Sequence, residues 1–180
     1  MLNRLLTFID TFTEYCGRYI AWLTVVMMVV MFTSVVLRYL FQIGFVALDE
    51  SVIYMHSMVF MLGAAFTLKR GGHVRVDIFY NQLSVIGKAR IDLLGSLFLL
   101  LPVSIFIAVI SWEYVTASWR IFESSPQVGG IPALFLLKSL ILLMSGLLLL
   151  QGIAELIRNA LILTGAISVQ TNSNNPIAGT

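Results

Sequence analysis

The chain has 180 residues, of which 59% are hydrophobic and 11% are charged, and its formal net charge is +2. A soluble domain carries about 25% charged residues, so this chain has too little charge to cover a globule in water. The small net charge gives no indication of a nucleic-acid partner. The single cysteine, Cys16, excludes an internal disulfide and a cysteine-cluster metal site. The composition therefore indicates an integral membrane protein.

Residues 2–18 have the pattern of an amphipathic helix. Apolar side chains recur at helical spacing on one face: Leu2, Leu5, Leu6, Ile9, Phe12 and Cys16. Charged side chains lie elsewhere on the wheel, which predicts a helix in the headgroup layer. The apolar run that follows is too long for the core of a signal peptide, so we expect this region to stay as an anchor.

Four stretches are long and apolar enough to cross the hydrocarbon core, which takes about 20 helical residues. They are residues 19–40, 48–68, 91–116 and 133–157. Residues 78–90 show a second, weaker interfacial pattern, and the polar residues 171–180 are predicted to be disordered. The predicted fold is an all-α integral membrane protein with one four-helix domain over residues 1–170. In the third stretch, Pro102 is predicted to kink the helix by removing a backbone hydrogen bond.

Lysine and arginine are distributed unequally between the two sides of this arrangement. The side with both termini and residues 69–90 holds most of them, whereas the other side holds only Arg38, Arg120 and Lys138. The positive-inside rule then predicts that both termini are cytoplasmic. Gly71 and Gly72, directly after Lys69-Arg70, are predicted to end the second helix, since glycine adopts the left-handed conformation of helix caps.

The second helix has two different sides. One side is small or polar, with a few larger residues: Asp49, Ile53, His56, Ser57, Phe60, Gly63, Ala64 and Thr67. The other side is bulky and apolar: Val52, Met55, Val59, Leu62 and Phe66. Small residues allow helices to approach closely, and polar ones form hydrogen bonds across the contact. We expect the first side to pack on protein and the second to face lipid or a looser neighbour.

Three polar residues in this helix allow two interpretations each. Asp49 and Glu50 fit an ion or proton site, because intramembrane carboxylates are costly; they also fit a helix start, where acids favour the dipole. His56 fits a haem ligand or proton relay, or a packing residue bonded across helices. A single haem cannot use both histidines of one chain, because His73 lies roughly 25 Å further along a continuous helix.

The stretch "SWRIFESSPQVGGIP", residues 118–132, is predicted to be an exposed loop on the side away from the termini. Its glycine pair and two prolines indicate turns. Trp119, Arg120 and Glu123, together with Arg38, are candidates for contact with headgroups or another protein. The sequence contains no phosphate-binding loop, no nucleophile with a base and no metal-ligand spacing, so we expect no enzyme activity.

The stretch "DESVIYMHSMVFMLGAAFTLKRGGHVRVDIF", residues 49–79, resembles the signature of the small membrane subunit of tripartite ATP-independent periplasmic (TRAP) transporters, the DctQ family. The resemblance rests on four features: the acidic pair Asp49-Glu50, the small stretch Leu62-Gly63-Ala64-Ala65, the basic Arg70, and the ending His73-Val74-Arg75-Val76-Asp77. A tryptophan often precedes the acidic pair in that family, and Ala47-Leu48 stand there in this chain.

The resemblance implies a scaffold subunit in a bacterial inner membrane. Its partners would be a large elevator-type subunit that carries substrate and sodium, and a periplasmic binding protein that delivers an organic acid. The small subunit itself would carry no cofactor or metal. Candidates for the partner interface are Asp49, Glu50, His56, Ser57, Gly63, Ala64 and Thr67. Candidates for a cytoplasmic fastening or contact with lipid are Arg70, His73, Arg75 and Asp77. The other interpretation is that these four charged residues only fix the orientation of the chain in the membrane.

Two other functions fit the sequence. A haem- or quinone-associated membrane anchor is suggested by His56 and the number of helices. A self-assembling channel or carrier is suggested by Asp49, Glu50 and Glu113 near one side of the membrane.

Overall fold

The computed structural model describes residues 2–72, 80 and 82–165, and the regular elements within these ranges are helices. Four of them are long and apolar enough to cross a membrane: Leu6–Leu40, Val46–Lys69, Val85–Arg120 and Leu134–Leu163. This confirms the predicted all-α fold with four spans. The predicted disordered tail, residues 171–180, lies outside the described residues.

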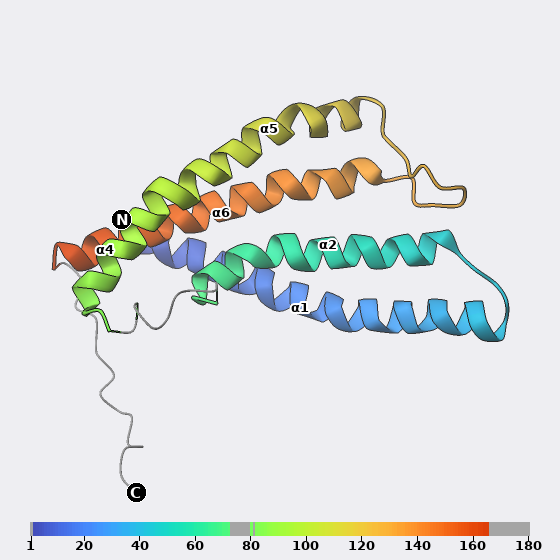
Figure 1. Ribbon diagram of the computed structural model, residues 1–180, viewed down its shortest axis with the longest axis horizontal. Coiled ribbons are helices and arrows are strands. Elements are labelled where there is room, and N and C mark those ends of the chain that lie inside the picture. The colour runs from blue at the N-terminus through green and yellow to red at the C-terminus, as the bar shows by residue number, and fades with distance from the viewer. Residues whose placement is uncertain (1, 73–79, 81, 166–180) are drawn as a thin grey trace, which may run out of the picture.

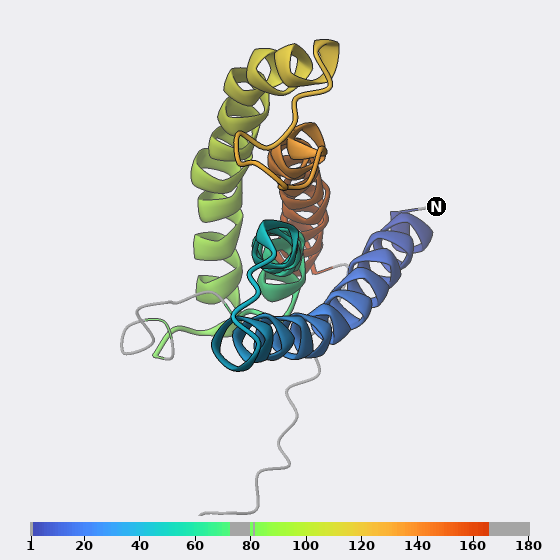
Figure 2. The same ribbon diagram turned by 90° about the vertical axis from the view of Figure 1, so that its right-hand side faces the viewer.

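The first helix, α1, runs without interruption from Leu2 to Leu40. The sequence predicts an interfacial helix over residues 2–18 followed by a separate span, whereas the structure has one helix, because no proline or glycine pair occurs between the two segments to end the first one. At 1.5 Å per residue, 39 residues extend about 58 Å, nearly twice the roughly 30 Å of hydrocarbon. The excess length is accommodated in an arc, which is visible in Figure 2.

The second helix, α2, covers Val46–Lys69 and ends as the sequence predicted. Gly71 has a φ of 63°, and its N–H donates to the carbonyl of Leu68 at 3.0 Å. The N–H of Gly72 donates to the carbonyl of Thr67 at 2.9 Å. These two bonds form a Schellman cap, which satisfies carbonyls that the helix end leaves open.

The third span consists of three consecutive helical segments. Helix α4 (Val85–Gly95) begins at Ser84, whose hydroxyl accepts a hydrogen bond from Gly87 N at 3.2 Å. A π-turn, η1 (Ser96–Leu100), leads into α5 (Leu101–Arg120). The π-turn ends two residues before Pro102, which has no N–H to donate. The hydrogen-bond pattern of the helix thus changes close to this proline, and π-turns occur in helices as such single turns; the kink itself stays a prediction. Residues 85–90, the last part of the segment 78–90 that the sequence predicts to be interfacial, form the beginning of α4.

The fourth span, α6 (Leu134–Leu163), lies at the centre of the arrangement. The helices form an open row in the order α1, α2, α6, α5, as Figures 1 and 2 both show. The first part of α1 turns back toward α6, where Leu6 and Ile9 pack against Ala154. We call the end with residues 41–45 and 121–133 the loop end, and the opposite end, where α1 begins, the terminal end.

The contacts between these helices use small and polar side chains. The largest side chains that are fully buried among the described residues are all polar: Gln151, Ser104, Ser118 and Ser145. Gly17 lies against the ring of Phe66, and a Cβ added there would overlap that ring. Helices in membranes associate through close approach and interhelical hydrogen bonds, and this core has both features.

Candidate functional site

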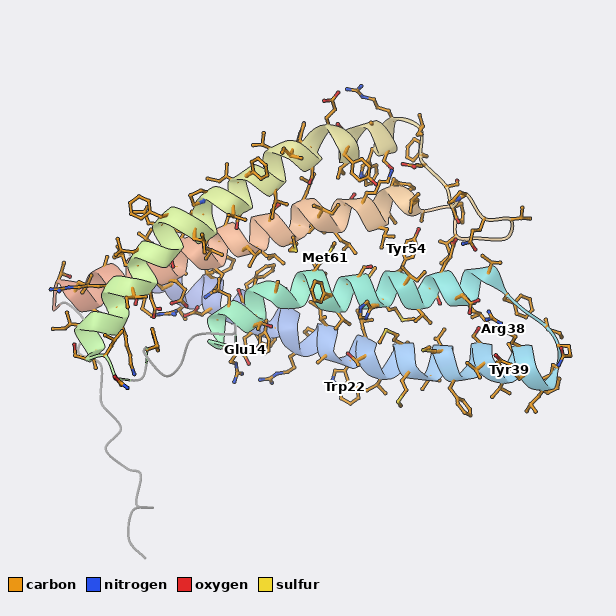
Figure 3. All side chains as sticks on the ribbon, viewed as in Figure 1. Glu14, Trp22, Arg38, Tyr39, Tyr54 and Met61 are labelled. Atoms are coloured by element: carbon orange, nitrogen blue, oxygen red, sulfur yellow. The ribbon has the colours of Figure 1, made fainter. Side chains whose placement is uncertain are left out.

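The acidic pair at the start of α2 divides its contacts between two elements. Asp49 accepts a hydrogen bond from Ser34 at 2.6 Å and forms an ion pair with Arg38, both on α1. Figure 3 shows Arg38 at the loop end, beside the connection from α1 to α2. The Asp49 carboxylate therefore joins the adjacent ends of α1 and α2. Charge-assisted hydrogen bonds of this type are about twice as strong as neutral ones.

Glu50 joins α2 to the loop between α5 and α6. Its carboxylate accepts hydrogen bonds from the hydroxyl of Ser125 and from the backbone N–H of Ile131, the latter at 2.6 Å. A Cβ at Gly130 would overlap the carboxylate and Ser125, so glycine is needed at this close approach. Glu50 thus holds a loop that begins 71 positions later in the sequence.

The loop also has its own attachment to α5 and α6. Glu123 forms an ion pair with Lys138, whose ammonium lies 4.2 Å from the ring centroid of Tyr114. The hydrogen bond from Lys138 lowers the pKa of Glu123 below its usual range. The indole N–H of Trp119 donates to Ser139 at 2.7 Å, and its ring packs edge-to-face on Phe135.

At the terminal end, charged residues fasten α1 to two other helices. Glu14 pairs with Lys69 at 2.9 Å and also with Arg70, at the end of α2. Asp10 pairs with Arg158 of α6 at 2.7 Å. The two acids are one helical turn apart on α1, so they lie on the same side of the helix. Sequence reasoning placed these acids in an interfacial helix and missed their partners.

A buried polar contact lies next to these ion pairs. Gln151 has no solvent exposure, and it accepts a hydrogen bond from the hydroxyl of Thr13 at 3.2 Å. A satisfied polar pair of this kind favours one register between two helices, since any shift would leave buried polar atoms unpaired. The sequence signal for it was a lone glutamine in the apolar fourth span.

The small and polar side of α2 is only partly covered by this chain. Ile53, His56 and Phe60 are exposed, whereas Ser57, Gly63, Ala64 and Thr67 are half-buried. A Cβ at Gly63 would meet no atom within 4 Å, so open space lies beside it. Within the chain it is instead Phe66, from the bulky side, that packs on α1 at Gly17. This contact differs from the expectation that the bulky side faces lipid or a looser neighbour.

The remaining predicted residues fall into two groups. Arg120 is exposed at the end of α5, whereas the other three docking candidates, Arg38, Trp119 and Glu123, have partners within the chain. His73, Arg75 and Asp77 lie outside the described residues. Among the residues that are described, no group of three or more His, Cys, Asp or Glu side chains could hold a metal ion.

Comparison with known proteins gives two matches. Residues 27–161 match the family model of the DctQ component of tripartite ATP-independent periplasmic transporters. The chain is also similar to the C4-dicarboxylate TRAP transporter small permease protein DctQ of Vibrio cholerae serotype O1, with 30% identity over 115 residues. That alignment covers 62% of this chain and 47% of the relative, so the chain spans about half the length of the curated relative it matches. No solved structure matches.

Proposed function

The chain belongs to the DctQ family of TRAP transporter small permease subunits, and from this premise we propose that it is the fixed scaffold of a two-part membrane permease. The larger subunit would move like an elevator and would carry the sodium and substrate sites. A periplasmic binding protein would deliver an organic acid to it. The scaffold itself would need no cofactor.

The observation that supports a scaffold most directly is the combination of fastened ends with an uncovered middle. Ion pairs and hydrogen bonds join α1, α2 and α6 at the terminal end, and α1, α2 and the 121–133 loop at the loop end. Between the two ends, His56 is exposed on an apolar helix. A polar side chain in hydrocarbon is costly unless another protein covers it. We therefore assign the α2 side with Ile53, His56, Phe60 and Gly63 to the contact with the large subunit.

We also propose an orientation for the subunit. The terminal end would face the cytoplasm and the loop end the periplasm, as the distribution of lysine and arginine favours. The binding protein would then dock at the loop end. Arg120 and the fully exposed Val128 are among the side chains available to it there, whereas Arg38 and Glu123 are engaged within the chain.

The channel hypothesis has less support. Asp49 and Glu50 would have to face a pore, yet both carboxylates are engaged in hydrogen bonds that hold neighbouring elements together.

The test is affinity purification of the tagged chain from its native membrane in mild detergent, followed by mass spectrometry. We expect a larger polytopic membrane protein in equal amount, and the periplasmic binding protein as a weaker companion. A chain that purifies alone, or only with copies of itself, would contradict the scaffold. A visible haem absorption band in the preparation would favour the redox anchor instead.

A further inference from the structure

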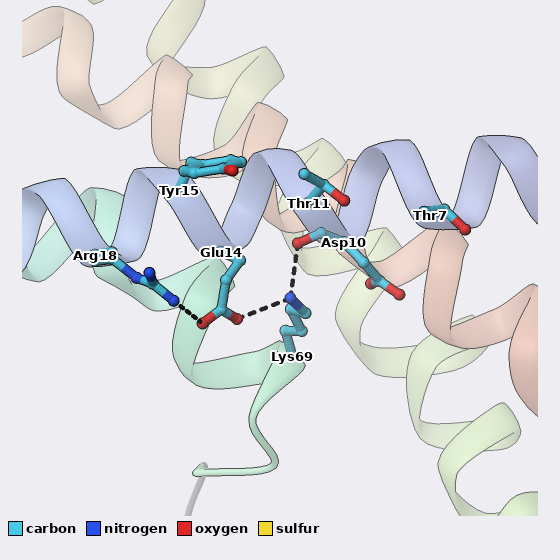
Figure 4. A pocket seen from close by; sticks show the side chains of 7 residues that line it. All are labelled: Thr7, Asp10, Thr11, Glu14, Tyr15, Arg18 and Lys69. Atoms are coloured by element: carbon cyan, nitrogen blue, oxygen red, sulfur yellow. Dashed lines mark hydrogen bonds and ion pairs between the residues drawn. The ribbon is translucent and has the colours of Figure 1, made fainter.

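Two exposed arginines, one from α1 and one from the end of α2, meet at the terminal end. Arg70 pairs with Oε1 of Glu14, and Arg18 lies 3.9 Å from the same oxygen; their side chains are 59% and 70% exposed, respectively. The other carboxylate oxygen, Oε2, accepts a hydrogen bond from Lys69 at 2.9 Å. Figure 4 shows Glu14 between Arg18 and Lys69. One carboxylate thus faces three cations, which leaves a surplus of positive charge.

The close crossing of α1 and α2 brings these two arginines together. The ring of Phe66 fills the space beside Gly17, the residue directly before Arg18. The guanidinium carbon of Arg70 lies 5.2 Å from the centroid of the same ring. The contact between the helices therefore holds both guanidinium groups beside one carboxylate, where their like charges would otherwise drive them apart.

The surplus positive charge lies on the α2 side of α1. Two other acids at this end, Asp10 and Glu155, pair with Arg158 on the α6 side. Each guanidinium group has five N–H donors, and the bond from Arg70 to Glu14 takes one of them. Arg18 stands beyond hydrogen-bond distance of that carboxylate. Guanidinium donors beside surplus positive charge match the free oxygens of a phosphate group in geometry and in sign.

An exposed apolar track leads from Arg18 along α1 into the span. Trp22, Val25 and Val29 follow at steps of four, three and four residues, so they lie on the same side of the helix as Arg18, and all three are exposed. From Arg18 to Val29 the helix rises about 16 Å, close to half of the roughly 30 Å of hydrocarbon. Trp22 and the exposed Tyr19 stand at the start of the track, as is typical where hydrocarbon meets the headgroups. A phosphate at Arg18 thus has an apolar surface of one-leaflet length beside it.

We propose that Arg18 and Arg70 bind the phosphate of an anionic phospholipid such as phosphatidylglycerol, with an acyl chain along the track. Both guanidinium groups donate to the free phosphate oxygens. Phosphatidylethanolamine and phosphatidylcholine carry the same phosphate, but the surplus positive charge repels the cation of their headgroups. The bound lipid joins α1 to the end of α2 through a shared anion, a role that goes beyond the proposed scaffold function.

The experiment uses the full chain, together with any partner that co-purifies, after its native lipids have been exchanged for detergent. Native mass spectrometry then follows titration with phosphatidylglycerol, phosphatidylethanolamine and phosphatidylcholine that have identical acyl chains. We expect one phosphatidylglycerol per chain, bound about tenfold more tightly than the other two lipids. Glycerophosphoglycerol and inorganic phosphate, added at the same concentration as the lipid, should not displace it, because neither has an acyl chain to lie along the track.

Two matched variants localise the binding. Arg18→Gln removes the more loosely held cation and should weaken phosphatidylglycerol binding about tenfold. Arg4→Gln removes the same charge from an exposed position on the same side of α1, about 21 Å away, and should bind normally. Thermal midpoints equal to that of the original chain show that both variants are folded.

Three results would overturn the proposal. Equal weakening by Arg4→Gln and Arg18→Gln would show a general attraction of the basic end for anionic lipid instead of a site. Equal affinity for the three lipids would show that the surplus charge does not select the headgroup. Displacement by glycerophosphoglycerol or inorganic phosphate would identify a free anion as the occupant in place of a lipid.

Discussion

Asp49 and Glu50 are adjacent in the sequence, but successive helical positions point about 100° apart, so the two carboxylates reach different elements. Asp49 holds α1 through Ser34 and Arg38. Glu50 holds the 121–133 loop through Ser125 and Ile131. The acidic pair that marks the family resemblance thus has a structural use at each position. An ion pathway is not needed to explain why two costly carboxylates stand there.

Replacing Glu50 with alanine should free the loop. Hydrogen bonds to a charged group contribute about 1.5–3 kcal/mol, so the amide of Ile131 should exchange with solvent at least tenfold faster. Hydrogen–deuterium exchange of the detergent-solubilised chain measures this. Glu113→Ala, another acid near the loop end that is exposed, is the matched control and should leave the exchange unchanged. Unaltered protection of Ile131 in Glu50→Ala would show that the loop is held by other contacts.

The ion pair of Glu123 with Lys138 should make the loop end sensitive to acid. The pKa of Glu123 is lowered in the folded chain, chiefly by the hydrogen bond from Lys138. A lowered folded-state pKa gives stability that is complete above the unfolded-state pKa and is lost as pH falls through the folded value. We expect the midpoint temperature of thermal unfolding of the original chain to fall between about pH 5 and pH 3 more steeply than that of Glu123→Gln. Parallel pH profiles would rule this pair out as a source of acid sensitivity.

At the scale of elements, α1 and α2 owe their close crossing to one glycine. The ring of Phe66 occupies the space where a side chain at Gly17 would be. Gly17→Val should therefore separate the two helices and cost about 1–3 kcal/mol. Circular dichroism on heating should show an earlier transition. Gly146→Val makes the same chemical change in α6, where a Cβ meets no atom within 4 Å, and should behave like the original chain.

The apolar cores of the four spans could be predicted because length and hydropathy alone define them. The end of α2 could also be predicted, since Gly71 supplies a cap conformation that few other residues adopt. The extent of α1 could not, because an amphipathic segment can continue straight into a span when nothing breaks the helix. The pairs Glu14–Lys69 and Glu50–Ile131 were equally out of reach, since one sequence does not reveal which distant helix ends meet.

At the scale of the whole molecule, the open row leaves large areas of α1, α2 and α5 uncovered. A closed bundle would bury those areas within the chain. An open row fixed at both ends instead presents a broad surface whose shape changes little. This is the property that a stationary partner of a moving subunit requires, and it is the physical basis of the scaffold proposal.

Gly63→Leu tests which surface makes that contact. Because no atom of this chain lies within 4 Å of a Cβ at Gly63, the variant should fold with an unchanged thermal midpoint. Its larger side chain should still obstruct a neighbouring helix and lower recovery of the large subunit about tenfold in co-purification. Gly63→Ala, the matched smaller change, should recover nearly all of it. Full recovery with Gly63→Leu would move the interface to another side of the chain.

The central position of α6 also has a consequence for how the protein is made. Helices α1 and α2 can pair as soon as both have left the ribosome, but α5 has its main contact with α6, which is synthesised after it. Until α6 enters the membrane, α5 lacks the helix against which it mainly packs. A nascent chain that stalls before residue 134 would therefore lack the helix that packs on both α2 and α5, and its two halves would be held together chiefly by the contacts of Glu50 with the 121–133 loop. Membrane quality-control proteases would find their substrate in that state.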